Sequence, residues 1–306
     1  MPMSTIRQPH GRAVGIGRAV AMIVLAAFFL FPILFMFMSS FKPNLDLLRD
    51  STSLRAFLPV GQISLDNYAG VFKRVPAALF VFNSLFVTLM TVVLGLIFNS
   101  MAGFAISRLK WRGRNAVLTL VIATLIVPFE TIAIPLLLLV SKLPWIGLQD
   151  GALNFEQGWL DSYQVQIVPF IANGFSIFLF AQYFKSLPID LDEAARVDGA
   201  TGFQVYRRII MPLSGPAIAT VAILTFLPTW NAYLWPLMVT QSEAVRPVMV
   251  GLQYFFQVTG GGGGGGGVAW GEIMAYLSMI TLPVLVLYVA LQRSFVESIA
   301  ASGVKG

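Results

Sequence analysis

Long charge-free runs of apolar residues dominate this chain. A helix needs about 20 apolar residues to cross the hydrocarbon core of a bilayer. Six runs reach this length, at residues 19–41, 75–107, 115–141, 162–184, 209–242 and 273–292, and Glu130 in the third run is the one charged residue within them. The pattern predicts an all-α membrane protein with six transmembrane helices.

The first run, 19–41, has two interpretations. An Arg-containing front followed by an apolar stretch is also typical of a cleaved signal peptide. However, the apolar part is about 20 residues long, whereas the apolar region of a signal peptide has about 7–15. No A-x-A-like cleavage site follows it. We therefore expect it to remain as a transmembrane anchor.

Composition supports the membrane interpretation and excludes several kinds of site. Hydrophobic residues make up 57% of the chain and charged residues 11%, against about 25% charged in an average soluble domain. There is no cysteine, and the single histidine, His10, lies in the polar N-terminal tail. Disulfides, thiolate metal sites and histidine-based catalysis are thereby excluded, and we expect no metal site and no catalytic residues.

The net charge of +6 raises the question of nucleic-acid binding, and the placement of the basic residues answers it. Segments 1–18, 107–114, 185–208 and 293–306 together hold 13 of the 20 Lys and Arg residues. Because cytoplasmic loops carry an excess of Lys and Arg, both termini are predicted to be cytoplasmic. The positive charge therefore indicates topology, and no nucleic-acid partner is expected.

The predicted organisation follows from these segments. It consists of a cytoplasmic tail 1–18, a first transmembrane helix 19–41, a core 80–292 with five transmembrane helices, a cytoplasmic loop 185–213 within that core, and a cytoplasmic tail 293–306.

The loop 185–213 carries strong helix signals. Asp190 is a candidate N-cap with Glu193 three residues later, which is the spacing of a capping box. Gly199 predicts a stop, Thr201 can cap a second short helix, and Pro212 ends it. The small residues of the first helix would let another protein approach closely. An amphipathic helix lying in the membrane interface is the alternative.

This loop resembles the EAA loop of the membrane subunits of ABC importers. The family pattern is EAA, three residues, G, nine residues and I-x-L-P. Glu193, Ala194, Ala195, Gly199, Ile209 and Pro212 match it in spacing. Met211 stands in place of the Leu. In that family the loop forms the coupling helix, which docks on a cytoplasmic ATPase.

The resemblance extends over most of the chain and points to permeases of carbohydrate importers, particularly the second membrane subunit of the maltose importer. The first matching segments are Asn83-Ser84 and a turn with Phe104, Ala105, Arg108 and Gly113-Arg114. The others are Pro128-Phe129-Glu130 with Pro135-Leu136, Trp230-Asn231, Leu282-Pro283, Gln292-Arg293 and the tail 303–306. The tail departs from the pattern at Glu297 and Ser298, where a glycine is usual.

The resemblance implies partners and a set of coupling residues. It implies a second permease subunit, an ABC ATPase dimer that holds ATP and magnesium, an extracytoplasmic solute-binding protein and the lipid of a bacterial inner membrane. The residues it assigns to ATPase coupling are Asp192, Glu193, Ala194, Ala195, Asp198, Gly199, Ile209 and Pro212.

ATP hydrolysis is not expected on this chain. Its one glycine-rich stretch, Gly260 to Gly267, lacks the Lys and the Ser or Thr of a P-loop. It is interpreted as a flexible loop that contacts the binding protein, as a plain linker, or as a placeholder for unidentified residues.

Candidate residues for a translocation path are fewer. Glu130 is the one acidic residue deep within a predicted span, and intramembrane ionisable groups commonly mark a pathway. Trp230, Asn231 and Tyr233 combine aromatic faces with polar groups that suit a sugar. The alternatives are a charge satisfied by backbone N–H groups at a helix break around Pro128 and ordinary interfacial aromatics.

The sequence thus predicts a permease subunit of an ATP-driven importer for a carbohydrate or related solute (sugar, polyol or glycerophosphodiester). The alternatives are a secondary transporter or channel driven by an ion gradient and, more remotely, a membrane-anchored scaffold.

Overall fold

A computed structural model describes residues 11–43, 46–47, 49, 52–53, 55, 58, 61–144, 148–149, 152–153, 158–260 and 269–303. The chain divides into two compact units, which are described separately. Unit 1 comprises Met1–Val75 and Phe255–Thr281, and unit 2 comprises Pro76–Tyr254 and Leu282–Gly306. The run Gly260 to Gly267 lies outside the described residues except for Gly260.

Unit 1 is built from an apolar helix and shorter elements at its end. Its helices are α1 (Gly11–Ser40), α3 (Asp66–Arg74), most of α15 (Gln253–Gly260) and the first part of α16 (Trp270–Gly303). The amide of Asn67 donates to the carbonyls of Ser40 and Lys42 at 2.9 and 2.8 Å, which closes the end of α1. An ion pair of 2.6 Å joins Arg74 to Glu272.

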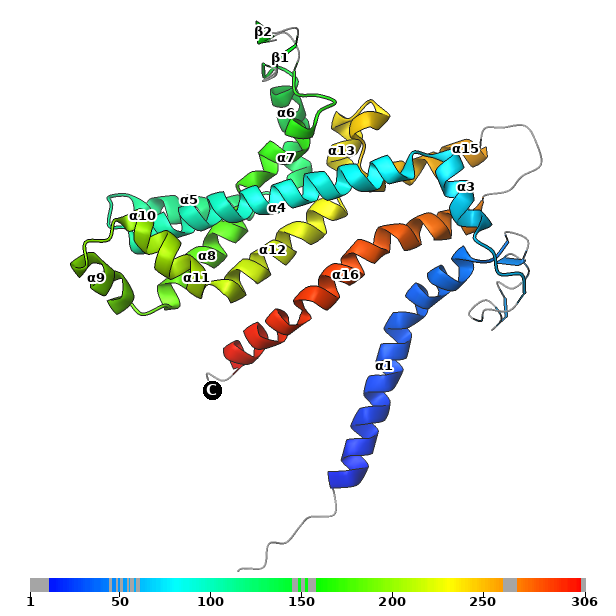
Figure 1. The fold of residues 1–306 in the computed structure, drawn as a ribbon, viewed down its shortest axis with the longest axis horizontal. Coiled ribbons are helices and arrows are strands. Elements are labelled where there is room, and N and C mark those ends of the chain that lie inside the picture. Colours follow the sequence, from blue (N-terminus) through cyan, green and yellow to red (C-terminus); the bar gives the residue numbers. More distant parts are fainter. Residues whose placement is uncertain are drawn as a thin grey trace, which may run out of the picture. The chain divides into compact units, whose positions relative to one another are not determined.

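Unit 2 is organised along α4 (Ala77–Arg108), which packs against α5, α7, α8 and α12 (Figure 1). The other longer helices are α5 (Arg114–Thr124), α6 (Phe129–Val140), α7 (Tyr163–Ile171), α8 (Gly174–Ser186), α9 (Asp190–Val197) and α12 (Gly215–Trp230). Shorter elements are α10 (Gly202–Val205), a π-helical turn Tyr206–Ile210, α11 (Met211–Leu213), α13 (Leu234–Val239), a 3₁₀ turn Glu243–Val245, α14 (Val248–Gly251), and the antiparallel pair β1 (Leu148–Gln149) and β2 (Ala152–Leu153).

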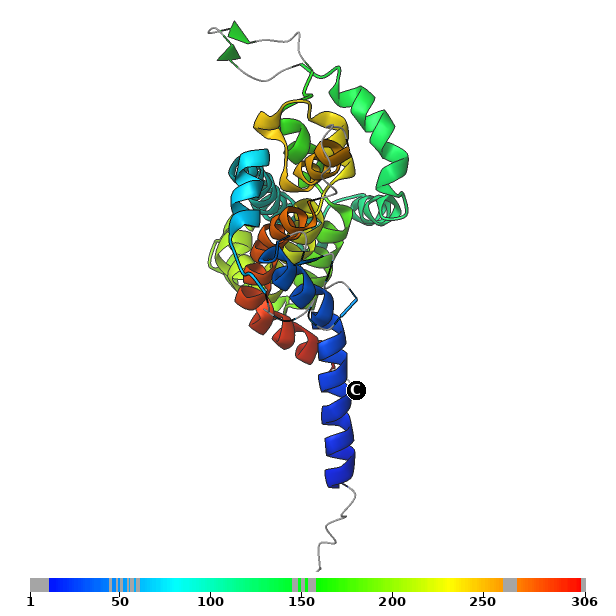
Figure 2. The ribbon, with the colours of Figure 1, turned by 90° about the vertical axis from the view of Figure 1, so that its right-hand side faces the viewer.

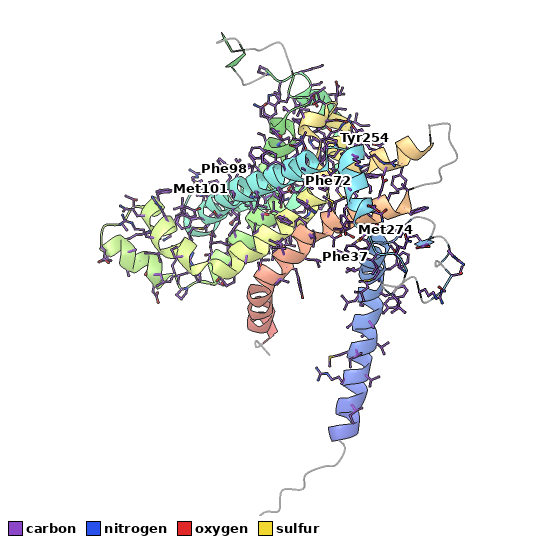
Figure 3. All side chains as sticks on the ribbon, turned by 45° about the vertical axis from the view of Figure 1, so that its right-hand side comes forward. Phe37, Phe72, Phe98, Met101, Tyr254 and Met274 are labelled. Carbon is purple, nitrogen blue, oxygen red and sulfur yellow. The ribbon has the colours of Figure 1, made fainter. Side chains whose placement is uncertain are left out.

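The two faces of α4 differ in the size of their side chains. Its buried face carries small and polar residues, among them Gly103, where an added Cβ would lie 2.7 Å from the Cβ of Phe180 on α8. Small residues of this kind let transmembrane helices approach closely. The opposite face exposes large apolar side chains, including Phe98 and Met101 (Figure 3). This face is suited to lipid or to an apolar partner.

The described residues contain four helices long and apolar enough to cross a membrane, or six if each of two bent helix pairs counts as one span. The four are Gly15–Ser40, Ala77–Arg108, Tyr163–Ser186 and Trp270–Ala290. The predicted all-α fold is confirmed, and six spans is the upper count that the structure allows.

The third and fifth apolar runs do not form single straight helices. As expected from Pro128, the third run breaks, and α6 turns away from α5 by 102° (Figure 2). The run 209–242 counts as one span only if the helices on the two sides of its bend are taken together. The chain bends by 81° before α12, because Pro216 has no N–H for the carbonyl of Pro212, and it breaks again between α12 and α13.

Candidate functional site: the coupling segment and a cavity

The helix α9 begins one residue earlier than the sequence suggests. Asp190 was expected as the N-cap, but Ile189 occupies that position without a side-chain hydrogen bond. Ile189 already has helical dihedral angles, and its carbonyl accepts from the N–H groups of Asp192 and Glu193 at 2.9 and 3.2 Å. The acidic residues therefore lie in the first turn, where the helix dipole favours them without a capping box.

Gly199 ends α9 in the way its sequence position predicts. Its φ is +79°, and the N–H of Ala200 donates to the carbonyl of Ala195 at 2.9 Å while the N–H of Gly199 donates to Arg196 at 3.0 Å. These two bonds form a Schellman motif, which requires a left-handed residue at the position of Gly199. An added Cβ would meet nothing within 4 Å, so the requirement for glycine comes from the backbone.

The second half of the segment also begins as predicted. The Thr201 hydroxyl accepts from the N–H of Gln204, and the Gln204 side chain accepts from the N–H of Thr201 at 2.7 Å, which makes a complete capping box. The chain continues through the π-helical turn to α11, where Pro212 is exposed and Ile209 is half-buried. We refer to α9, α10, the π-helical turn and α11 as the coupling segment.

Neighbouring residues of α9 face in opposite directions. Glu193, Ala194 and Asp198 are exposed, and Val197 is 88% exposed. Ala195, by contrast, is buried in an apolar cluster with Phe184, Val205 and Tyr206. The expectation that Ala195 offers a surface to another protein is therefore wrong, because it packs inside this chain.

A buried ion pair fastens α9 to the ends of two longer helices. Arg108 ends α4 and Asp192 lies in the first turn of α9; both are buried, and Nη1 of Arg108 lies 3.5 Å from Oδ2 of Asp192. Arg108 Nη2 also donates to the carbonyls of Phe184 and of Leu187, the latter at 2.7 Å, at the end of α8. This side chain thus joins α4, α8 and α9.

From the sequence, Arg108 was expected only to contribute to membrane topology, and its contact with Asp192 was not predicted. The available signal was weak: an arginine directly after an apolar helix and an acidic residue in a distant amphipathic helix. Asp192 was predicted among the coupling residues, and the structure places its carboxylate against Arg108, within this chain.

A cavity of about 520 Å³ lies between α6, α7, α12 and α13, with residues of α4 in its wall. Glu130 and Tyr233 line it. Trp230 is buried and stacks on Phe226 with ring centroids 5.9 Å apart, and the amide of Asn231 donates to the carbonyl of Leu227 at 2.9 Å. The cavity wall includes neither Trp230 nor Asn231.

The chain matches a known family over more than half of its length. Residues 92–300 fit the family described as binding-protein-dependent transport system inner membrane component. The chain therefore belongs to this family and is a permease component of an ABC importer, a multi-pass membrane protein.

Its relatives include named permeases. The arabinooligosaccharides transport system permease protein AraQ of Bacillus subtilis (strain 168) is 34% identical over 284 residues, which cover 92% of this chain and 93% of AraQ. The trehalose/maltose transport system permease protein MalG of Thermococcus litoralis is 29% identical over 295 residues, which cover 94% of this chain and 95% of MalG.

A solved structure agrees with the fold. A chain of a bacterial ABC transporter involved in the import of the acidic polysaccharide alginate superposes with a TM-score of 0.77 at 26% identity, covering 96% of this chain and 99% of that chain. These matches confirm the predicted permease class. They lend no support to a secondary transporter or channel driven by an ion gradient.

Proposed function

We propose that this chain is one permease subunit of an ATP-driven importer of carbohydrates. The observation that carries the proposal is its similarity, along more than nine-tenths of their length, to permeases named for arabinooligosaccharide and trehalose/maltose transport. Its partners would be a second permease, an ATPase dimer that binds ATP and magnesium, and an extracytoplasmic binding protein. In this proposal the coupling segment and both termini face the cytoplasm.

The exposed face of α9 is proposed to dock on the ATPase. Glu193, Ala194, Val197 and Asp198 are exposed there, and Gly199 sets the sharp exit of the chain. The side chains of Ala194 and Val197 are small enough to enter a cleft, while the acidic groups favour basic residues on the partner. Docking can drive transport only if it is tighter in one state of the importer than in the other.

Arg108 is proposed to carry movement of α9 into the membrane-spanning helices. Its contacts to Asp192, Phe184 and Leu187 make the end of α4, the end of α8 and the start of α9 one connected structure. A displacement of α9 would therefore displace α4 and α8 with it.

The test is reconstitution of the chain with and without its proposed partners in proteoliposomes. We expect uptake of labelled arabinotriose, lactose or trehalose when all subunits, the binding protein and ATP are present, and no uptake by the chain alone. Uptake by the chain alone, driven by an ion gradient, would contradict the proposal.

A pair of glycine variants tests the docking face. Neither Gly199 nor Gly215 has any atom within 4 Å of an added Cβ, but Gly199 alone of these two has a positive φ. Gly199→Val should disrupt ATPase association and uptake, since valine at positive φ is strained, and Gly215→Val should affect them less. Intact docking and uptake in Gly199→Val would show that α9 is not the coupling helix.

A further inference from the structure

Three interrupted helices of unit 2 meet at the same cavity. Its wall includes Glu130 next to the start of α6, Ala172 at the break between α7 and α8, and Ala232 at the break between α12 and α13. Irregular backbone at membrane depth is tolerated where it is buried in protein or lines a water-filled cavity. The coincidence of three breaks therefore indicates a site that accommodates polar groups.

Proline residues in the wall free backbone carbonyls for other partners. Pro169 cannot donate to the carbonyl of Val165, and the indole N–H of Trp235 donates to it instead, at 2.9 Å. Pro228 likewise leaves the carbonyl of Leu224 without its helical donor, and both residues line the cavity. The carbonyl of Val165 thus helps to fix the wall through its bond from Trp235.

Side chains supply further hydrogen-bond acceptors. Gln166 is buried, and its amide N–H₂ donates to the carbonyls of Ser162 and Val245 at 3.3 and 2.9 Å. Its Oε1 has no partner among the described residues, although Gln166 lines the cavity. Burying an acceptor without a partner is costly. The carboxylate of Glu130 and the hydroxyl of Thr229 add acceptor atoms to the same wall.

Aromatic rings form one corner of the cavity. Phe129, Phe170 and Trp235 pack pairwise with centroids 5.6 to 5.9 Å apart, and all three line it. The bond from Trp235 to Val165 holds this cluster in place. A solute that suits the cavity has an apolar ring face for the aromatic rings and several O–H donors for the acceptors.

We propose that this cavity binds one neutral sugar unit of the transported solute within this subunit. The inference rests on the proposed function and goes beyond it by assigning solute contacts to this chain. The volume of about 520 Å³ lies in the range of small-molecule sites, about 300–1,000 Å³. Among the described residues, the wall contains Glu130 and no Lys or Arg, so it favours a neutral sugar over an acidic one.

Two threonines of α12 offer a matched pair for the test. The hydroxyls of Thr229 and Thr220 each donate to the carbonyl four residues earlier at 2.8 Å, and only Thr229 of the two lines the cavity. In the reconstituted importer, Thr229→Val should lower uptake of labelled arabinotriose, lactose or trehalose about fivefold, the worth of one hydrogen bond. Thr220→Val should leave it unchanged.

The same experiment measures co-purification of the ATPase with the permease, which reports assembly. We expect assembly to be unchanged in Thr229→Val, and we expect Thr229→Ser, which restores the hydroxyl, to restore uptake. Glu130→Gln should lower uptake of the neutral probe about tenfold, since hydrogen bonds to a charged group are stronger. It should also weaken discrimination against an alginate oligosaccharide.

The outcomes separate the two proposals. Wild-type uptake in Thr229→Val and Glu130→Gln would overturn the sugar site and leave the proposed function intact. A Thr229→Ser variant that takes up the probe as slowly as Thr229→Val would also overturn the sugar site. Failure of the wild-type importer to take up any of the neutral probes with ATP would count against the proposed function itself.

Discussion

Arg108 and Gln166 are both buried polar side chains of unit 2, yet the structure uses them differently. Arg108 places Nη1 near the carboxylate of Asp192 and donates from Nη2 to two carbonyls at the end of α8, while its Nε has no partner among the described residues. Gln166 is fixed by its amide N–H₂, and it borders the cavity, while its buried Oε1 has no partner among the described residues. Arg108 connects three helices at a closely packed place, whereas Gln166 borders a space that a solute can enter.

The contrast extends to the surroundings of the two residues. Around Arg108, the cluster of Phe104, Phe184, Val205 and Tyr206 is closely packed, which suits an element that transmits displacement. Around Gln166, interrupted helices leave open volume. One apolar helix bundle therefore combines a closely packed connection around Arg108 with an open cavity beside Gln166, and mutations at the two places should have different consequences.

The largest loss of stability is expected from a substitution of Arg108. Arg108→Met leaves the carboxylate of Asp192 buried without its partner, and removing one member of a buried pair costs about 3–5 kcal/mol. We expect a matching loss of stability in thermal unfolding of the detergent-solubilised importer, together with loss of ATP-driven uptake.

The double variant Arg108→Met/Asp192→Asn sharpens this result. Because it removes the uncompensated charge, it should recover part of the lost stability but not the coupling. Stability losses that simply add would show that the two side chains do not interact.

A smaller loss of stability is expected at the cavity, from Trp235→Phe. The change removes the indole N–H that satisfies the Val165 carbonyl, and an unsatisfied buried acceptor costs about 1–3 kcal/mol. Thermal unfolding should show this loss, and solute uptake should fall because the aromatic corner loosens. Trp159→Phe is the control, since its indole bond to Pro144 is exposed; equal effects of the two changes would contradict the argument.

The capping box at Thr201 should contribute about 1 kcal/mol. Thr201→Ala removes the acceptor for the N–H of Gln204, so the coupling segment should fray more readily. Hydrogen exchange of the amides in α10 would detect the change. Thr119→Ala, which removes a hydroxyl bonded within its own helix α5, is the control and should leave these amides unaffected.

The smallest effect is a pH dependence at Asp161, outside the spanning helices. Burial raises the pKa of its carboxyl, but hydrogen bonds from Ser242 and Gln241 and the charge of Arg246 outweigh burial, so the pKa is lowered overall. A lowered pKa in the folded state contributes stability above the ordinary pKa of the group. That contribution is lost as the pH falls through the folded value.

The stability difference between the wild type and Asp161→Asn should therefore shrink as the pH is lowered below about 4. Thermal unfolding at a series of pH values measures it. A difference that grows towards acid pH would contradict the assigned direction.

Much of the fold follows from local patterns. Apolar runs predict the helices, Pro128 predicts the break of the third run, and Gly199 and Thr201 predict a helix stop and a cap that the structure contains. These features were predictable because each depends on residues within a few positions along the chain. The bend before α12 could also have been predicted, because Pro216 has no N–H to donate to the carbonyl of Pro212, four residues earlier. This bend was not among the features predicted from the sequence.

The candidate site was less predictable. Glu130 and Tyr233 lie on the cavity as the path prediction requires, while Gln166, Thr229 and the aromatic corner were not anticipated. No spacing along the sequence marks them, because they come from α6, α7, α12 and α13 and meet only when these helices pack. Their role in translocation, like that of Trp230 and Asn231, stays a prediction.

The class of protein, the helical fold and the place of the coupling segment can be predicted from the amino-acid sequence alone. Hydrophobic length and the spacing of the EAA pattern are properties of the chain alone. The packing of the helices, by contrast, turns Asp192 inward to Arg108 while Glu193 beside it faces outward, and it places Gln166 at the border of a cavity. The physical reason is that a polar side chain's role depends on its partners, and the partners of Arg108 lie 76 to 84 residues away along the chain.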